Sequence, residues 1–268
     1  IQRYVSENGV PDIIHAHSAI YGGVIAKEVA CELNIPFVLT EHNTGFARNV
    51  FANWQLKIAE NAFDCANSCI AVSPNLGSLI SKQMPGINVE WQWVPNMVAD
   101  RFNINKYHKR KETLRFFNLG LMTKKKGQSD LLKAFSKVIN SGAKAELWFG
   151  GDGPVKSQLE MEVKSLGLEE YVSFLGKIEP NEVPILLKKI DIMVISSHYE
   201  TFGVVAAEAL MAGIPVVATR SGGPDCIVEE GDGVLVTPKN PDSLSRGMLK
   251  VMANIDEFDP AKISKKAK

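Results

Sequence analysis

Short apolar runs of the kind found in buried strands alternate with amphipathic segments along the whole chain. Runs of this length, bounded by Gly, Pro, Asn or Asp, predict strands, and the longer segments between them predict helices. Expected strands cover residues 12–15, 36–40, 68–72, 89–94, 114–119, 145–149, 172–175, 191–196, 215–218 and 233–236. The clearest expected helices cover residues 51–66, 129–141, 154–166 and 204–212. Such alternation predicts the α/β class, with parallel sheets covered by helices.

One segment interrupts this pattern. Residues 99–112 are polar, basic and without periodicity, which is typical of a linker. We therefore expect two domains, at residues 1–104 and 105–268. The first has only four expected strands, fewer than the five or six of an ordinary sheet. Together with a first residue that is not Met, this leads us to expect a chain truncated at both ends, with an incomplete first domain.

Composition narrows the class of partner and the compartment. The 268 residues carry no net charge, so no global field favours nucleic acid or a membrane surface. The four cysteines lie in helical or apolar contexts without paired spacing, which favours free thiols and a reducing, cytoplasmic compartment. No apolar run is long enough to span a bilayer, and we find no signal peptide.

Two carboxylates are the most informative residues in the sequence. Glu200 precedes an expected helix, and Glu208 lies inside the apolar run of that helix. A buried carboxylate without a partner costs several kcal/mol, and no cation lies within helical reach of Glu208. A pair of sugar hydroxyls would satisfy it; the alternative is a core carboxylate bonded by distant backbone groups. Helix N-termini such as residues 202–204 favour anionic ligands.

Glycine-rich turns follow several expected strands of the second domain. The turn of residues 120–127 (GLMTKKKG) lets the backbone approach a phosphate, and Lys126 adds a point charge. A solvated basic surface is the alternative. Further turns lie at residues 150–154 (GGDGP), 174–178 (FLGKI) and 222–225 (GGPD). Each of these alone is ordinary turn chemistry.

The first domain contains a group of polar residues at its expected strand ends. His15 and His17 alternate along one strand, so both rings should lie on one side of the sheet. Metal binding would need a third ligand, which is not evident. The next strand ends in Thr40-Glu41-His42-Asn43-Thr44, with Arg48 shortly after.

In this order, from about residue 11 to 242, the motifs resemble the group 1 retaining glycosyltransferases, whose GT-B fold has two Rossmann-like domains. The family's paired glutamates match Glu200 and Glu208. Its phosphate turn matches at Gly120, Lys126 and Gly127, but Leu121 stands where the family has arginine; Lys124 or Lys125 would have to substitute. Its usual Asn-Gly is here Asn96-Met97.

The resemblance implies roles for individual residues. Glu200 would hold hydroxyls of the donor sugar, Glu208 the ribose, and Lys126 the diphosphate, while His17 would contact the sugar and His15 would be structural. The implied catalytic residues are His17, Glu200 and Lys126. The implied donor-binding residues are Gly120, Lys126, Gly153, Lys177, Ile178, Glu200, Phe202, Gly203, Val204 and Glu208. The implied acceptor-side residues are His42, Asn43, Thr44 and Arg48.

The implied activity is transfer of a sugar, with retention, from a nucleoside diphosphate sugar to a glycan or lipid-linked acceptor in polysaccharide biosynthesis. We expect no cofactor and no metal, because the sequence has no Asp-x-Asp motif. We expect no nucleic acid partner. Peripheral contact with the inner membrane face is expected through a missing N-terminal part. Neither the sugar nor the base (UDP, GDP or ADP) is identified.

Two alternatives stay open at this point. A non-catalytic nucleotide-sugar-binding homologue is favoured by Leu121, although Glu200, Glu208, Lys126 and His17 are all present. A nucleotide-sugar epimerase of the same architecture would need several acid–base carboxylates, and the first domain offers only Asp12 and Glu41.

Overall fold

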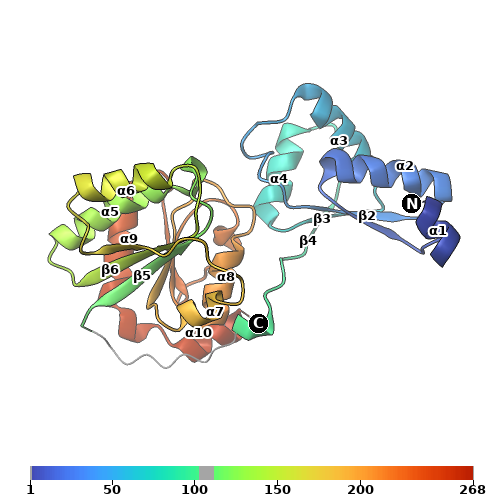
Figure 1. The fold of residues 1–268 in the computed structure, drawn as a ribbon. Helices are drawn as coiled ribbons and strands as arrows, with labels where there is room; N and C mark the ends of the chain where they lie inside the picture. The colour runs from blue at the N-terminus through green and yellow to red at the C-terminus, as the bar shows by residue number, and fades with distance from the viewer. Residues whose placement is uncertain (1, 103–111, 268) are drawn as a thin grey trace. The chain divides into compact units, whose positions relative to one another are not determined.

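A computed structural model describes residues 2–102 and 112–267 of the chain (Figure 1). The chain forms two compact units, Ile1–Asn96 and Met97–Lys268. The predicted domain boundary, between residues 104 and 105, falls outside the described residues. Each unit is a parallel α/β layer structure, as the alternating pattern predicts.

In the described part of the first unit, a four-stranded parallel sheet has the order β1-β2-β3-β4. Its strands are β1 (Ile14–His17), β2 (Phe37–Glu41), β3 (Ser68–Ala71) and β4 (Trp91–Trp93). Its helices are α1 (Gln2–Asn8), α2 (Val24–Leu33), α3 (Asn53–Cys65) and α4 (Pro74–Gln83), with a tight π-type turn at Ala19–Gly23. Buried Leu39, Phe46, Phe63 and Ile80 form part of its core. The order of these strands follows the chain, so successive strand ends lie side by side.

The second unit contains a six-stranded parallel sheet of order β10-β9-β8-β5-β6-β7. Its strands are β5 (Leu114–Leu119), β6 (Ala145–Gly150), β7 (Val172–Phe174), β8 (Ile192–Ile195), β9 (Val216–Thr219) and β10 (Gly233–Val236). Its helices are α5 (Gln128–Asn140), α6 (Lys156–Ser165), α7 (Val183–Leu187), α8 (Val204–Met211), α9 (Pro241–Ala253) and α10 (Pro260–Lys266). Apolar side chains of α5, α6 and α9 fill one face of the sheet, and those of α7, α8 and α10 fill the other.

The strand order of the second unit determines where a ligand site can form. β5 lies next to β8, and the chain winds outward from this pair in both directions. In open α/β sheets, ligands bind outside the carboxyl ends of the strands at such a switch point. A ligand site is therefore expected at the loops that follow β5 and β8.

The predicted strands are all confirmed, with ends that differ by at most two residues. The predicted linker is wrong at its start. Asp100–Phe102 form a 3₁₀ turn, and the Phe102 side chain is 2% exposed in the core beside α8. An aromatic residue flanked by polar residues is too weak a pattern to indicate burial, and only the tertiary contact reveals it. The rest of this segment, residues 103–111, lies outside the described residues.

Candidate functional site

The turn after β5 and the loop after β8 are joined by backbone-directed hydrogen bonds. The Ser196 hydroxyl donates to the Lys126 carbonyl at 2.8 Å, and the His198 amide donates to the Lys125 carbonyl at 2.8 Å. His198 Nε2 also lies 2.8 Å from Asp130 Oδ2 at the start of α5. Gly127 adopts a φ of 65°, and a Cβ there would lie 2.1 Å from the Ser196 carbonyl oxygen. Only glycine permits this approach, which brings the predicted phosphate turn against the predicted glutamate loop.

Lys126 and Glu200 meet at this junction. Lys126 Nζ lies 2.5 Å from Glu200 Oε1, which also accepts a hydrogen bond from the Ser197 hydroxyl at 2.7 Å. The Lys126 side chain is 26% exposed and that of Glu200 is 12% exposed. The structure thus brings together two of the predicted catalytic residues, which lie 74 positions apart in sequence.

The Glu200 loop is held from its other side by the turn after β9. The Glu200 amide donates to the Ser221 carbonyl, and the Gly223 amide donates to the Glu200 carbonyl, both at 2.8 Å. A Cβ at Gly223 would lie 2.3 Å from the Phe202 backbone. Asp225 accepts from the Gly222 amide at 2.8 Å, so its carboxylate shapes this turn.

Helix α8 begins directly beyond this loop. Phe202 is buried, Gly203 caps the helix with a φ of 91°, and Val204 opens its first turn. The unpaired amides of a helix N-terminus form an anion-binding site. The predicted residues Phe202, Gly203 and Val204 therefore place this N-terminus beside the Lys126–Glu200 pair.

Glu208 lies inside α8 and is partly buried. Burial raises the pKa of its carboxyl from 4.5 to about 6, and the nearby Arg101 guanidinium acts in the opposite direction. Within residues 2–102 and 112–267, the structure gives the Glu208 carboxylate no hydrogen bond or ion pair. Sequence reasoning missed Arg101 because it precedes the first strand of the unit and no local motif marks it.

The other glycine turns form the edge of the same site through backbone contacts. Gly120 donates to the Gly150 carbonyl at 3.0 Å, and Gly151 donates to the Gly176 carbonyl at 2.7 Å. A Cβ at Gly151 would lie 2.1 Å from the Gly120 carbonyl oxygen, and one at Gly153 would lie 2.3 Å from that of Met122. The three turns are therefore in contact.

The remaining residues of the predicted donor side follow two strands: Leu121 follows β5, and Lys177 and Ile178 follow β7. The Leu121 side chain is 58% exposed, while its carbonyl accepts from Gln128 Nε2 at 3.3 Å. Lys177 is exposed and pairs with Glu179 at 2.8 Å, which raises the pKa of Lys177. Ile178 packs against the core beside α7 and α8.

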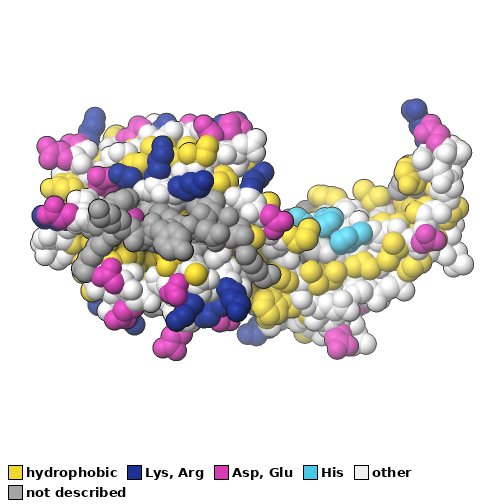
Figure 2. All heavy atoms as spheres, turned by 90° about the horizontal axis from the view of Figure 1, so that it is seen from below, with side chains coloured by type: hydrophobic (Ala, Val, Ile, Leu, Met, Phe, Trp, Pro, Cys, Tyr) yellow, Lys and Arg dark blue, Asp and Glu magenta, His cyan; other side chains and the backbone are white. Residues whose placement is uncertain are grey.

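The first unit carries a row of histidines, and histidine side chains gather on one of its faces in Figure 2. The ring centroids of His15 and His17 are 4.5 Å apart, and those of His17 and His42 are 5.5 Å apart. This confirms that His15 and His17 share one side of the sheet. His15 Nε2 lies 2.7 Å from the Thr40 hydroxyl oxygen, and the structural role of His15 stays a prediction. No group of three metal-ligating side chains is found in the described part of the chain.

The remaining acceptor-side residues follow His42 along the same loop. The Asn43 side chain accepts from the Gly45 amide at 2.7 Å, and Thr44 is partly buried. Arg48 is exposed, and its amide donates to the Thr44 carbonyl at 3.2 Å. His42, Asn43, Thr44 and Arg48 thus form one loop at the end of β2, and their contact with an acceptor stays a prediction.

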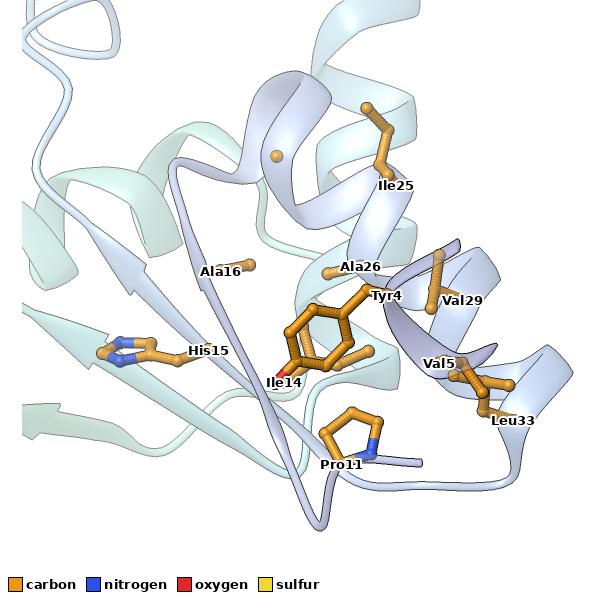
Figure 3. Close-up of a pocket in the computed structure, with 11 residues that line it drawn as sticks. Tyr4, Val5, Pro11, Ile14, His15, Ala16, Ile25, Ala26, Val29 and Leu33 are labelled. Carbon is orange, nitrogen blue, oxygen red and sulfur yellow. The ribbon is translucent and has the colours of Figure 1, made fainter. Parts of the chain in front are cut away.

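An apolar cavity of about 280 Å³ lies in the first unit between α1, β1 and α2 (Figure 3). Its lining is mostly aliphatic, from Val5, Ile14, Ile25, Val29 and Leu33 among others. Nucleotide sites need several placed polar groups, so this cavity is unsuited to the donor.

Across the described helices, none combines the length and apolar character that crossing a membrane requires.

Comparison with known proteins agrees with this geometry. The family model described as "Glycosyl transferases group 1" matches residues 100–268, and that described as "Glycosyltransferase Family 4" matches residues 1–99. The N-acetyl-alpha-D-glucosaminyl L-malate synthase of Bacillus anthracis is 30% identical over 82% of this chain and 60% of its own. The glycogen synthase of Mycobacterium tuberculosis is 24% identical over 96% of this chain and 63% of its own. The chain thus spans less than two thirds of the length of these relatives.

Solved structures share the fold. Anabaena HepE in complex with UDP has a TM-score of 0.84 at 22% identity, covering 99% of this chain and 75% of that chain. The sucrose-phosphate synthase of Thermosynechococcus elongatus has a TM-score of 0.83 at 20% identity, covering 99% of this chain and 70% of that chain. The fold is therefore GT-B, with two Rossmann-like units. Because one family model covers more than half of the chain, the protein belongs to the group 1 glycosyltransferases.

Proposed function

We propose that this protein transfers a glycosyl unit, with retained anomeric configuration, from a nucleoside diphosphate sugar to a glycan or lipid-linked acceptor. The observation that carries the proposal is the Lys126–Glu200 pair at the β5–β8 switch point, beside the N-terminus of α8. A cation, a carboxylate and the N-terminus of a helix in one place support this proposal, because a sugar diphosphate carries both hydroxyl groups and negative charge.

Charge develops on the diphosphate as the glycosidic bond breaks. Lys126 and the first amides of α8 stabilise that charge through a preorganised electrostatic effect. We expect metal-independent transfer, since these groups supply the positive charge that the leaving group requires. Glu200 holds hydroxyls of the donor sugar and Glu208 those of the ribose, which gives the Glu208 carboxylate the partners it needs. His17 contacts the sugar, and the loop from His42 to Arg48 faces the acceptor.

Calorimetric titration with UDP, GDP and ADP tests the donor site. UDP is the first nucleotide to try, because HepE was solved with UDP. We expect one nucleotide to bind saturably, and Glu208→Ala to weaken it by about ten-fold or more, the value of a charge-assisted hydrogen bond. Glu160→Ala, which removes an exposed helix carboxylate of the same unit, is the matched control. Binding of none of the three nucleotides, or equal binding by both variants, would contradict the proposed site.

A non-catalytic nucleotide-sugar-binding protein is the second candidate. Leu121 favours it, because this exposed apolar side chain supplies no charge at a position where the family has arginine. Assays of sugar transfer and donor hydrolysis distinguish the two functions, since this candidate binds the donor without turning it over. Of the two carboxylates that the first domain offers to the epimerase alternative, Glu41 is fully buried and only Asp12 is exposed, which is fewer than the several that an epimerase would need.

A further inference from the structure

Glu41, the last residue of β2, is a fully buried carboxylate. Its Oε2 atom accepts from the Ala19 amide at 2.8 Å. Its Oε1 atom accepts from the His42 amide at 2.8 Å, the Asn43 amide at 2.7 Å and, more weakly, the Ser18 hydroxyl at 3.3 Å. Both oxygens are therefore satisfied by donors of the protein itself.

The donors belong to two different loops. Ser18 and Ala19 directly follow His17 at the end of β1, whereas His42 and Asn43 begin the loop after β2. Each oxygen serves mainly one loop: Oε2 bonds the first, and Oε1 bonds the second. A single side chain thus holds the two backbone segments that carry His17 and His42.

The loop after β1 needs such an anchor. Ser18 and Tyr21 adopt φ values of 67° and 69°, in the left-handed region that is strained for a residue with a side chain. A Cβ at Gly22 would lie 2.4 Å from the His17 carbonyl oxygen, so the loop folds tightly back on that residue. The bonds from the Ser18 hydroxyl and the Ala19 amide to Glu41 tie this strained turn to the end of β2.

Ionisation of Glu41 is governed by opposing contributions. Burial raises the pKa of its carboxyl, whereas the Ala19, Asn43 and His42 amides and the nearby His42 ring lower it. Backbone amides that converge in this way form an anion-binding concavity. Here the protein fills that concavity with its own carboxylate.

We propose that Glu41 is a positioning residue, which fixes the loops after β1 and β2 so that the His17 and His42 rings stay in contact on one face of the first unit. The inference rests on the proposed function, because it assigns those histidines to the sugar and acceptor side. It concerns their geometry, however, and this can be measured without turnover.

Glu41→Gln is the sharpest test. The amide oxygen of the new glutamine can still accept from the His42 and Asn43 amides. Its NH₂ group then faces the Ala19 amide, and because both groups are donors, that hydrogen bond is lost. Glu28→Gln makes the same chemical change at an exposed site on α2 and is the matched control. We expect Glu41→Gln to fold, to lose the NOE between the His17 and His42 rings, and to release the Ala19 amide. Loss of one hydrogen bond of about 1–1.5 kcal/mol corresponds to roughly ten-fold faster exchange.

The result that would overturn the proposal is an unchanged NOE in Glu41→Gln with Ala19, His42 and Asn43 amides as protected as in Glu28→Gln. If the variant does not fold, native-state hydrogen exchange of the unaltered protein decides. The proposal expects these three amides to open together, and independent opening of Ala19 and His42 would refute it. Titration with UDP, GDP and ADP separates this outcome from the proposed function, because the predicted nucleotide contacts belong to the second unit and should be unaffected by Glu41→Gln.

Discussion

Replacement of Glu200 by Gln should tighten the binding of a nucleoside diphosphate. In the structure, Lys126 is already paired with Glu200 at 2.5 Å, so a diphosphate must draw Lys126 away from a carboxylate that also repels it. Glu200→Gln removes the competing charge and keeps a side chain of the same size. The freed ammonium then interacts with the phosphates alone.

The magnitude follows from the burial of the pair. Unit charges 2.5 Å apart attract by about 7 kcal/mol at an effective dielectric constant of 20, before any desolvation. Exposed pairs contribute about 0.2–1 kcal/mol net, and breaking fully buried ones costs about 3–5 kcal/mol. With side chains 26% and 12% exposed, this pair should lie between, at about 1–2 kcal/mol. That value corresponds to roughly 5- to 30-fold tighter binding of the diphosphate.

A nucleotide sugar should respond differently, because Glu200 is proposed to hold its hydroxyls. The lost charge-assisted hydrogen bond, about 1.5–3 kcal/mol, cancels or exceeds the gain at Lys126. Calorimetry of the nucleoside diphosphate that binds, and of a nucleotide sugar with the same base, measures both effects in unaltered protein, Glu200→Gln, Lys126→Met and the double variant. Glu160→Gln serves as the charge-matched control. Unchanged or weaker binding of the nucleoside diphosphate by Glu200→Gln, or additive effects in the double variant, would refute the reasoning.

Four further predictions test other parts of the second unit. Because burial raises the pKa of Glu208 from 4.5 to about 6, the folded state holds this proton more tightly than the unfolded chain, and stability falls as pH rises between these values. Glu208→Gln should therefore raise the free energy of unfolding by about 1–2 kcal/mol at pH 7 and leave it unchanged below about pH 4.5, as measured by thermal melts. An increase that does not depend on pH would exclude this cause. Gly127→Ala should lower the free energy of unfolding in urea by about 2–4 kcal/mol, because the new Cβ would collide with the Ser196 carbonyl. Gly167 has the same φ of 65° but open space around it, so the control Gly167→Ala should lower it by only about 1 kcal/mol. Phe102→Ala should lower the free energy of unfolding of the second unit by about 3–5 kcal/mol in thermal melts of the whole chain. A change below about 1 kcal/mol would show that Phe102 is not part of that core. Leu121→Arg should tighten the binding of whichever nucleoside diphosphate the protein takes several-fold, more at low salt than at high salt, and a salt-independent effect would argue against a phosphate contact.

Much of the second unit was predictable from its sequence because its strands are nearly all apolar and end in turn residues. β5 and β10 begin and end where their patterns predict. The pairing of Lys126 with Glu200 is consistent with the predicted strand-end motifs, but the contact itself depends on which strands are neighbours. That order, with β5 beside β8, is set by packing and leaves no local signal in the sequence.

Other features depend on contacts that no short pattern records. Phe102 belongs to the core although its neighbours are polar, and Arg101 influences Glu208 from a distant part of the sequence. The role of Glu41 is also difficult to predict from the sequence. A carboxylate at a strand end suggests chemistry with a substrate, yet its four donors come from the protein's own loops. Only burial and the direction of each hydrogen bond separate these two roles.

The backbone contacts between the glycine turns have a consequence for how the protein can diversify. At Gly127, Gly151 and Gly153 the neighbouring atoms are main-chain carbonyls, which every amino acid shares. Leu121 likewise contributes its carbonyl to the turn while its side chain points to solvent. Substitutions around these glycines can therefore alter the charge or shape of the surface and leave the backbone contacts between the turns intact. Over evolutionary time the surface around these glycines can change by point mutation while the backbone of the three turns keeps its fold.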